Sequence, residues 1–187
     1  MMKRVLMIVL VLLICMGSAM DEMKGPRGVG QADLQQGIDL MESNPEAAMA
    51  RFLAADGAGN KKAARYVGLM YEQGLGVEQD YAQAASWYEK GVEAGDLTSG
   101  YYLGLLYKQG LGVGQDYEKA AEYFSSVAAS ENKSATGVVD AGYELAQLYE
   151  QGLGVEQDPD RAMELYREAA EYGSENAAAA LDRLNAE

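Results

Sequence analysis

One short stretch has residue types and spacing that could support catalysis: Ser130-Glu131-Asn132-Lys133. Ser-x-x-Lys is the spacing of serine acylases, in which an activated serine hydroxyl attacks a carbonyl carbon. Those enzymes also carry Ser-Asp-Asn and Lys-Thr-Gly motifs, and neither occurs in this chain. The stretch also falls where we expect a loop rather than the start of a helix. We interpret it as a chance match.

Other residues that usually do chemistry are scarce. The chain has no histidine, which is the usual general base and the commonest metal ligand, and its one cysteine is Cys15. The segment Asp56-Gly57-Ala58-Gly59-Asn60 lacks the acidic positions of a calcium loop. A dinucleotide-binding Gly-x-Gly loop directly follows a β-strand, and no strand is expected before the Gly-x-Gly pairs of this chain. We therefore expect no catalytic residues, no cofactor and no metal site.

The dominant feature is a ten-residue stretch that occurs three times, at 71–80, 107–116 and 149–158. Each copy reads Tyr-x-Gln-Gly-Leu-Gly-Val-x-Gln-Asp. The copies are 36 and then 42 residues apart, and six extra residues, Glu131 to Thr136, account for the longer interval. A period in this range is typical of a stacked-repeat architecture.

Each copy is flanked by two predicted helices. Before the first copy, apolar residues at i, i+4, i+7 and i+8 form the stripe Ala63, Val67, Met70, Tyr71. Glycines such as Gly74 and Gly76 end that helix. Asp80 then caps a second helix with the stripe Tyr81, Ala84, Ala85, Tyr88, Val92. In the third copy Pro159 follows Asp158, which suits only the first turn of a helix. Each repeat is therefore predicted to be a helix–loop–helix hairpin.

The predicted organisation is an all-α solenoid of stacked hairpins. We expect a signal peptide at 1–19, a flexible linker at 20–32, a degenerate N-terminal capping repeat at 33–60, repeats at 61–96, 97–137 and 138–176, and a C-terminal capping helix at 177–187. Asn44-Pro45 marks a helix start inside the degenerate repeat. Gly68, Gly104 and Ala146 recur in mid-helix, where glycine costs roughly 1 kcal/mol relative to alanine. That recurrence predicts a close approach of two helices.

These motifs resemble the Sel-one-like repeat (SLR), a relative of the tetratricopeptide repeat. The resemblance rests on the three Gly-Leu-Gly-Val loops and on three sets of equivalent positions: Val67/Leu103/Leu145, Tyr71/Tyr107/Tyr149 and Ala84/Ala120/Ala162. It is strong over about 61–176 and weak over 33–60. Departures from the family pattern are few: Val67, Ala146, Gln83, Arg161 and Phe124.

The resemblance implies a binding surface, because first helices line the concave face of tetratricopeptide-like solenoids. Several residues of these helices lie off the main apolar stripe, and aromatic residues are enriched at interface hot spots. The predicted protein-binding residues are Arg65, Tyr66, Leu69, Tyr101, Tyr102, Leu105, Tyr143, Glu144 and Gln147. The alternative is that some of these tyrosines pack half-buried against the next repeat.

Charge and the N-terminal segment bear on partners and location. Lys3-Arg4, the apolar run 5–14 and Gly17-Ser18-Ala19 have the three-part layout of a cleaved secretory signal. A lipoprotein modified at Cys15 and a membrane anchor are the less favoured alternatives; about 20 apolar residues are needed to span a bilayer. Without residues 1–19 the chain has 13 basic and 29 acidic residues, a formal charge of −16. That charge disfavours nucleic acid and anionic membranes as partners.

We therefore expect an exported, non-enzymatic adaptor, in a bacterial periplasm or outside a cell, that binds a protein or peptide on its concave face. No stable membrane insertion is expected after signal cleavage. Two alternatives stay open: a hydrolase of cell-wall or similar material that uses carboxylates as acid and base, and a small-glycan binder that uses its tyrosines as a platform.

Overall fold

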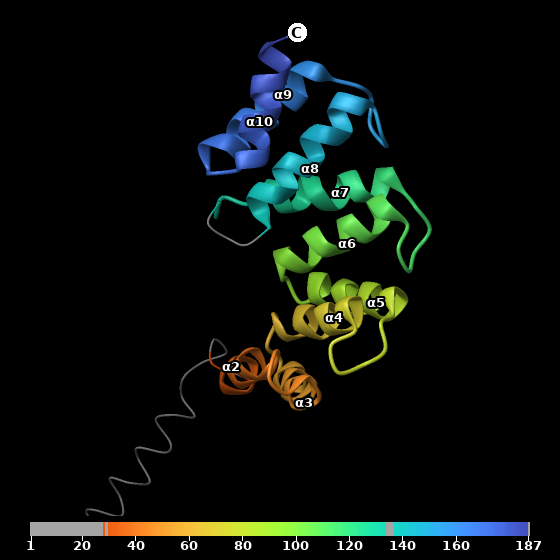
Figure 1. The fold of residues 1–187 in the computed structure, drawn as a ribbon, viewed down its shortest axis with the longest axis vertical. Helices are drawn as coiled ribbons and strands as arrows, with labels where there is room; N and C mark the ends of the chain where they lie inside the picture. The colour runs from red at the N-terminus through yellow and green to blue at the C-terminus, as the bar shows by residue number, and fades with distance from the viewer. Residues whose placement is uncertain (1–27, 29, 134–136, 187) are drawn as a thin grey trace, which may run out of the picture.

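A computed structural model describes residues 28, 30–133 and 137–186 (Figure 1). Within that part of the chain the secondary structure is helical, with no strand. The helices are α2 (Gln31–Leu40), α3 (Pro45–Gly57), α4 (Ala63–Gln73), α5 (Tyr81–Glu93), α6 (Leu97–Gln109), α7 (Tyr117–Ala128), α8 (Val138–Gln151), α9 (Pro159–Glu171) and α10 (Glu175–Asn185). The all-α prediction is confirmed. The predicted signal peptide lies outside the described residues, and the predicted linker overlaps the start of α2 at Gln31.

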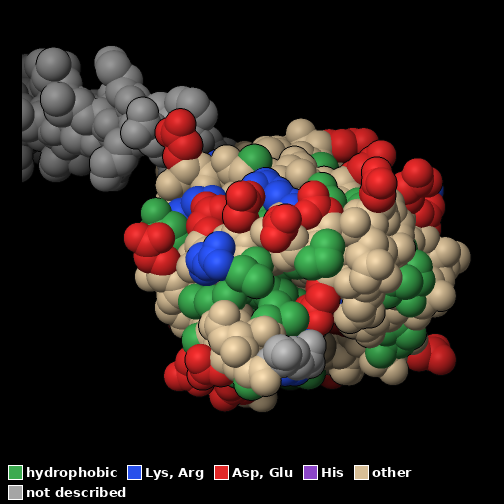
Figure 2. Space-filling model, turned by 90° about the horizontal axis from the view of Figure 1, so that it is seen from above, with side chains coloured by type: hydrophobic (Ala, Val, Ile, Leu, Met, Phe, Trp, Pro, Cys, Tyr) green, Lys and Arg blue, Asp and Glu red, His purple; other side chains and the backbone are tan. Residues whose placement is uncertain are grey.

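Consecutive helices pair into hairpins, α2 with α3 through α8 with α9, and the hairpins stack in chain order, with α10 packed on α9 (Figure 1). The first helices of neighbouring hairpins also touch, α4 with α6 and α6 with α8, whereas α5, α7 and α9 make no comparable contact with one another. The first helices therefore lie on the inner side of the curved stack. Seen from above, acidic side chains outnumber Lys and Arg around the rim, and apolar side chains gather near the middle (Figure 2).

The three glycine loops turn each hairpin as predicted. Helices α4, α6 and α8 end at Gly74, Gly110 and Gly152, whose φ angles of 69°, 72° and 68° are left-handed. The second helices begin at aspartate caps; the side chain of Asp158, for example, accepts a hydrogen bond from the backbone N–H of Arg161. The predicted cap at Asn44, followed by Pro45 in the first turn of α3, is also confirmed.

The second glycine of each loop joins neighbouring hairpins. At Gly112 (φ 68°) an added Cβ would lie 2.2 Å from the carbonyl carbon of Tyr81, at the start of the preceding second helix. Gly154 stands in the same relation to Tyr117, also at 2.2 Å. No side chain fits in that space, so glycine is required here both by its φ angle and by backbone contact.

The glycines predicted to allow close helix approach lie against an aromatic ring of the second helix, whereas the hairpin of α8 and α9 has the buried Ala146 at the equivalent position. A Cβ on Gly68 would lie 2.5 Å from the ring of Tyr88, and one on Gly104 would lie 2.7 Å from the ring of Phe124. The degenerate first hairpin has the same contact, between Gly37 and Phe52 at 2.5 Å. The rings of Tyr88, Phe124 and Phe52 are fully buried. This contact lies in the core of these three hairpins.

We expect Gly104→Leu to destabilise the protein by about 1–3 kcal/mol, because its side chain would overpack the Phe124 ring. Urea unfolding followed by circular dichroism measures the effect. Gly114→Leu is the matched control, since nothing lies within 4 Å of a Cβ added at that loop position. Equal unfolding midpoints for Gly104→Leu and the wild type would show that this helix crossing is not tightly packed.

Candidate protein-binding surface

The nine predicted binding residues occupy three equivalent positions on the inner helices α4, α6 and α8. The sets of equivalent residues are Arg65/Tyr101/Tyr143, Tyr66/Tyr102/Glu144 and Leu69/Leu105/Gln147. All are half-buried except Arg65, which is buried. We call the half-exposed surface that they form, together with its continuation onto α10, the first-helix face.

Two tyrosines of this face stack on the second helix of the preceding hairpin. The rings of Tyr66 and Phe52 have centroids 4.9 Å apart and an interplanar angle of 14°. Tyr102 and Tyr88 stack in the same way, at 5.3 Å and 17°. These tyrosines therefore join neighbouring hairpins and also contribute to the surface. Stacked aromatic pairs typically contribute about 0.5–1.5 kcal/mol beyond the area that they bury.

Arg65 is positioned differently from its equivalents Tyr101 and Tyr143. It is only 9% exposed, and its Nη1 lies 3.7 Å from Oδ1 of Asp96, the residue that caps α6. Its guanidinium carbon also lies 5.0 Å from the centroid of the Tyr66 ring. Arg65 is thus held in the joint between two hairpins rather than on the open surface.

Glu144 and Gln147 of the predicted set are tied together by Lys108. The Lys108 ammonium donates to Glu144 at 2.5 Å and to the Gln147 side-chain oxygen at 2.9 Å. The Gln147 amide in turn donates to the Tyr143 hydroxyl at 2.8 Å. Sequence reasoning missed Lys108, although it stands where the other two repeats have Glu72 and Glu150.

The middle repeat, which has lysine in place of glutamate, also differs from the other two at a second position, on the second helix. The Tyr88 hydroxyl donates to Glu72, and the Tyr166 hydroxyl donates to Glu150 at 2.7 Å. In the middle repeat the tyrosine is replaced by Phe124, which has no hydroxyl, and the carboxylate by Lys108. The two positions change together, so the lysine is available to link α6 to α8. A position-by-position comparison of the three repeats could have revealed Lys108, because Lys108 and Phe124 both depart from the other two repeats.

Tyr101 and Tyr102 of this face are uncharged at neutral pH. Burial raises the pKa of Tyr101 well above its ordinary value, and the neighbouring carboxylates of Asp140 and Glu144 raise it further. Burial also raises the pKa of Tyr102, against an opposing effect of the Arg65 guanidinium. Their hydroxyls are therefore hydrogen-bonding groups rather than bases.

A hollow of the face lies where α8, α9 and α10 meet and has a volume of about 530 Å³. Its lining includes Tyr143 and Gln147 of the predicted set and further residues that sequence reasoning missed: Glu150, Gln151, Tyr166, Asn176, Ala179, Ala180 and Arg183. Glu150 accepts a hydrogen bond from Arg183 at 2.6 Å, which ties α10 to α8. The hollow is open and is lined mainly by polar atoms.

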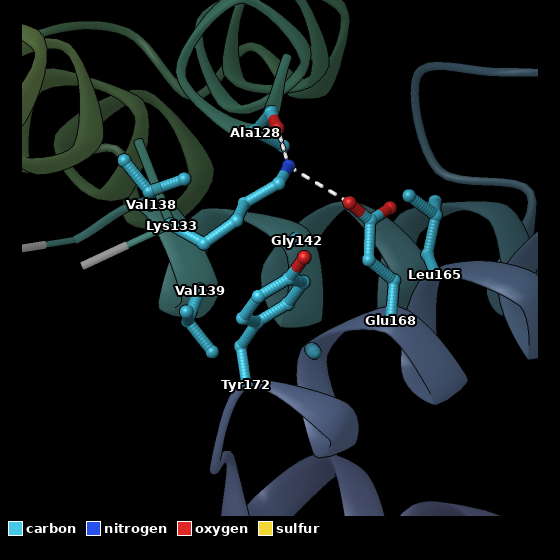
Figure 3. Close-up of a pocket in the computed structure, with 9 residues that line it drawn as sticks. Ala128, Lys133, Val138, Val139, Gly142, Leu165, Glu168 and Tyr172 are labelled. Atoms are coloured by element: carbon cyan, nitrogen blue, oxygen red, sulfur yellow. Dashed lines mark hydrogen bonds and ion pairs between the residues drawn. The ribbon is translucent and has the colours of Figure 1, made fainter. Parts of the chain in front are cut away.

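A smaller depression lies between the end of α7, the start of α8 and α9 (Figure 3). Lys133, from the segment between α7 and α8, extends across it and donates to the carbonyl oxygen of Ala128 at 2.6 Å. The same ammonium lies 2.8 Å from the carboxylate of Glu168. The remaining free volume is only about 10 Å³, too small for a ligand.

Two features of the described residues bear on other functions. They contain no group of three or more Cys, Asp or Glu side chains placed to hold a metal ion. No helix in that part of the chain is long and apolar enough to cross a membrane.

Comparison with known proteins identifies the repeats. The family model of the Sel1 repeat matches residues 61–96, 101–132 and 139–174, which is more than half of the chain. A Sel1 repeat protein from Oxalobacter formigenes is similar in structure, with 30% sequence identity and a TM-score of 0.70. A protective antigen of uropathogenic Escherichia coli strains with an SLR fold is similar too, with 29% identity and a TM-score of 0.71.

The matched structures are longer than this chain. The matches cover 79% and 83% of this chain, but 59% of the Oxalobacter protein and 33% of the Escherichia antigen. No protein of curated function matches the chain.

We expect Tyr88→Phe to destabilise the protein by about 1–3 kcal/mol, because Glu72 loses the hydroxyl that donates to it. Urea unfolding at pH 7 measures this cost. Tyr123→Phe is the control: its ring is stacked, and its hydroxyl has no hydrogen-bond partner among the described residues. Equal effects of the two substitutions would contradict a stabilising hydroxyl–carboxylate pair.

The Glu150 pair predicts a pH dependence. Burial favours the neutral carboxyl, but hydrogen bonds from Tyr166 and Arg183 outweigh burial and hold the pKa of Glu150 below its ordinary value of 4.5. The resulting stabilisation is present above pH 4.5 and is lost as the pH falls through the lower, folded-state pKa.

The difference in urea midpoint between the wild type and Glu150→Gln should therefore be largest near neutral pH and should shrink in acid. Glu156→Gln, at an exposed loop position, controls for the general effect of removing a negative charge. A difference that stays constant between neutral pH and strong acid would rule out this role of the Glu150 carboxylate.

Proposed function

Because the chain belongs to the Sel1 repeat family, whose members are generally protein-interaction scaffolds, we propose that it is an exported, non-enzymatic scaffold. It binds a protein or peptide along the first-helix face. The observation that carries this proposal is the placement of half-exposed tyrosines at equivalent positions of successive first helices.

Their anchoring makes these tyrosines suitable for binding. Tyr66 and Tyr102 are stacked on buried rings, and the Tyr143 hydroxyl accepts a hydrogen bond from Gln147. Their side chains therefore lose little conformational freedom when a partner docks, and this loss is a main cost of association. Rigid aromatic side chains are typical interface hot spots.

The states of the acidic side chains favour binding over catalysis. Glu72 and Glu150 accept hydrogen bonds from tyrosines, and Glu144 accepts one from Lys108. At Glu150, hydrogen bonds from Tyr166 and Arg183 outweigh burial and hold the pKa below its ordinary value, whereas a general acid at neutral pH needs a raised pKa. The chain also has no histidine to act as a base.

Export is part of the proposal and is supported by the sequence alone. Lys3-Arg4, the apolar run 5–14 and Gly17-Ser18-Ala19 have the layout of a signal peptide that is cleaved after Ala19. These residues lie outside the part of the chain that the structure describes.

A crosslinked pull-down from host envelope extract tests the proposal. We expect the wild-type protein to capture a specific partner and the variant Tyr66/Tyr102/Tyr143→Ala to lose it. Leu105→Glu provides a second, milder change of the same face. Circular dichroism confirms that each variant is folded at the assay temperature.

Tyr172→Ala is the matched control, because Tyr172 is 53% exposed and lies after α9, outside the first-helix face. It should retain the partner. Capture that survives both variants of the face and is lost only with Tyr172→Ala would move the binding site to the other side of the stack.

A further inference from the structure

Helix α10 occupies the place of a first helix but has small side chains where the others have large ones. Ser174 caps α10 as Asp96 caps α6, so Ala179 and Ala180 are equivalent to Tyr101 and Tyr102. On α8 the same two positions are Tyr143 and Glu144. The last joint of the stack therefore lacks the side chains that fill the earlier joints.

The structure shows what these side chains do in the earlier joints. Tyr66 and Tyr102 each lie flat against the aromatic ring of the preceding second helix, at centroid distances of 4.9 and 5.3 Å. At the last joint, the methyl group of Ala180 replaces such a ring. The hollow of about 530 Å³ lies at this joint, bounded by Tyr143, Ala179, Ala180 and Arg183.

We propose that this hollow binds an aromatic side chain, tyrosine or phenylalanine, from an extended segment of a partner protein. The partner's ring takes the place that Tyr102 fills at the joint between α5 and α6. This inference rests on the proposed function and assigns its binding surface a specific pocket. The proposed ligand is an aromatic ring carried by a polypeptide.

The lining favours a neutral aromatic ring over a charged or an aliphatic group. The opposite charges of the pocket, Glu150 and Arg183, are already paired at 2.6 Å, so the pair adds no net charge to attract an ion. A ring in the hollow can contact the half-exposed Tyr143 ring and the Arg183 guanidinium, through aromatic and cation–π interactions. An aliphatic side chain gains neither interaction.

Short peptides acetyl-Gly-Gly-X-Gly-Gly-amide, with X as Tyr, Phe or Leu, serve as probes. Two-dimensional NMR of the ¹⁵N-labelled protein reports where each peptide binds. We expect the Tyr and Phe peptides to shift the backbone amide signals of Ala179, Ala180 and Arg183 saturably. The Leu peptide should bind at least tenfold more weakly. Equal binding of all three peptides, or shifts confined to other surfaces, would overturn the proposal.

Ala180→Tyr supplies the missing ring from the chain itself and should therefore weaken binding of the Tyr peptide at least tenfold. Ala178→Tyr is the matched control: it makes the same substitution at an exposed position of α10 that does not line the hollow, and it should bind like the wild type. Thermal unfolding checks that both variants are folded. If Ala180→Tyr fails to fold, the comparison of the three peptides on the wild type still shows whether the hollow prefers an aromatic side chain.

The outcomes separate this inference from the broader proposal. If Ala180→Tyr keeps the partner captured in the pull-down while Tyr66/Tyr102/Tyr143→Ala loses it, the scaffold function stands and the aromatic pocket is wrong. If the Tyr peptide binds at α10 but no protein partner is captured, the pocket stands and the scaffold function is in doubt.

Discussion

The structure depends on one repeated contact, in which an aromatic ring of the second helix lies directly on a glycine of the first. The rings of Tyr88 and Phe124 leave no room for a Cβ at Gly68 and Gly104. In these hairpins the missing side chain lets the two helices approach closely, and in the hairpin of α8 and α9 the small residue Ala146 takes the same position. The loop glycines Gly112 and Gly154 then seat each hairpin on the backbone of the one before. Together these contacts build a curved stack with its first helices on the inner side.

The same geometry explains why a surface for partners arises along the first helices. A ring buried in one hairpin offers its other side to the next hairpin, where Tyr66 and Tyr102 stack on it. These tyrosines are therefore positioned by the core while remaining partly exposed. The polar residues around them vary between repeats, as Glu72 and Lys108 show, so one scaffold presents different chemistry along its length.

The sequence predicted the architecture well because its signals are local and occur three times: the Gly-Leu-Gly-Val loops, the aspartate caps and the small mid-helix residues Gly68, Gly104 and Ala146. The binding residues were harder to judge. Arg65 looked exposed from its helical position, but it pairs with Asp96 at the start of α6, a contact that periodicity within one helix does not reveal. The hollow beside Ala180 was missed because it arises from side chains that are small, and only comparison with Tyr102 in the equivalent position makes that visible.

Site-specific photo-crosslinking in living host cells would show whether partners bind the inner side of the stack. A benzophenone amino acid would replace either Leu105, half-buried on α6, or Ser86, exposed on the second helix α5. If partners bind the inner side, a partner is crosslinked from position 105 and none from position 86. Crosslinking from position 86 alone would contradict it and would place the binding site on the outer helices.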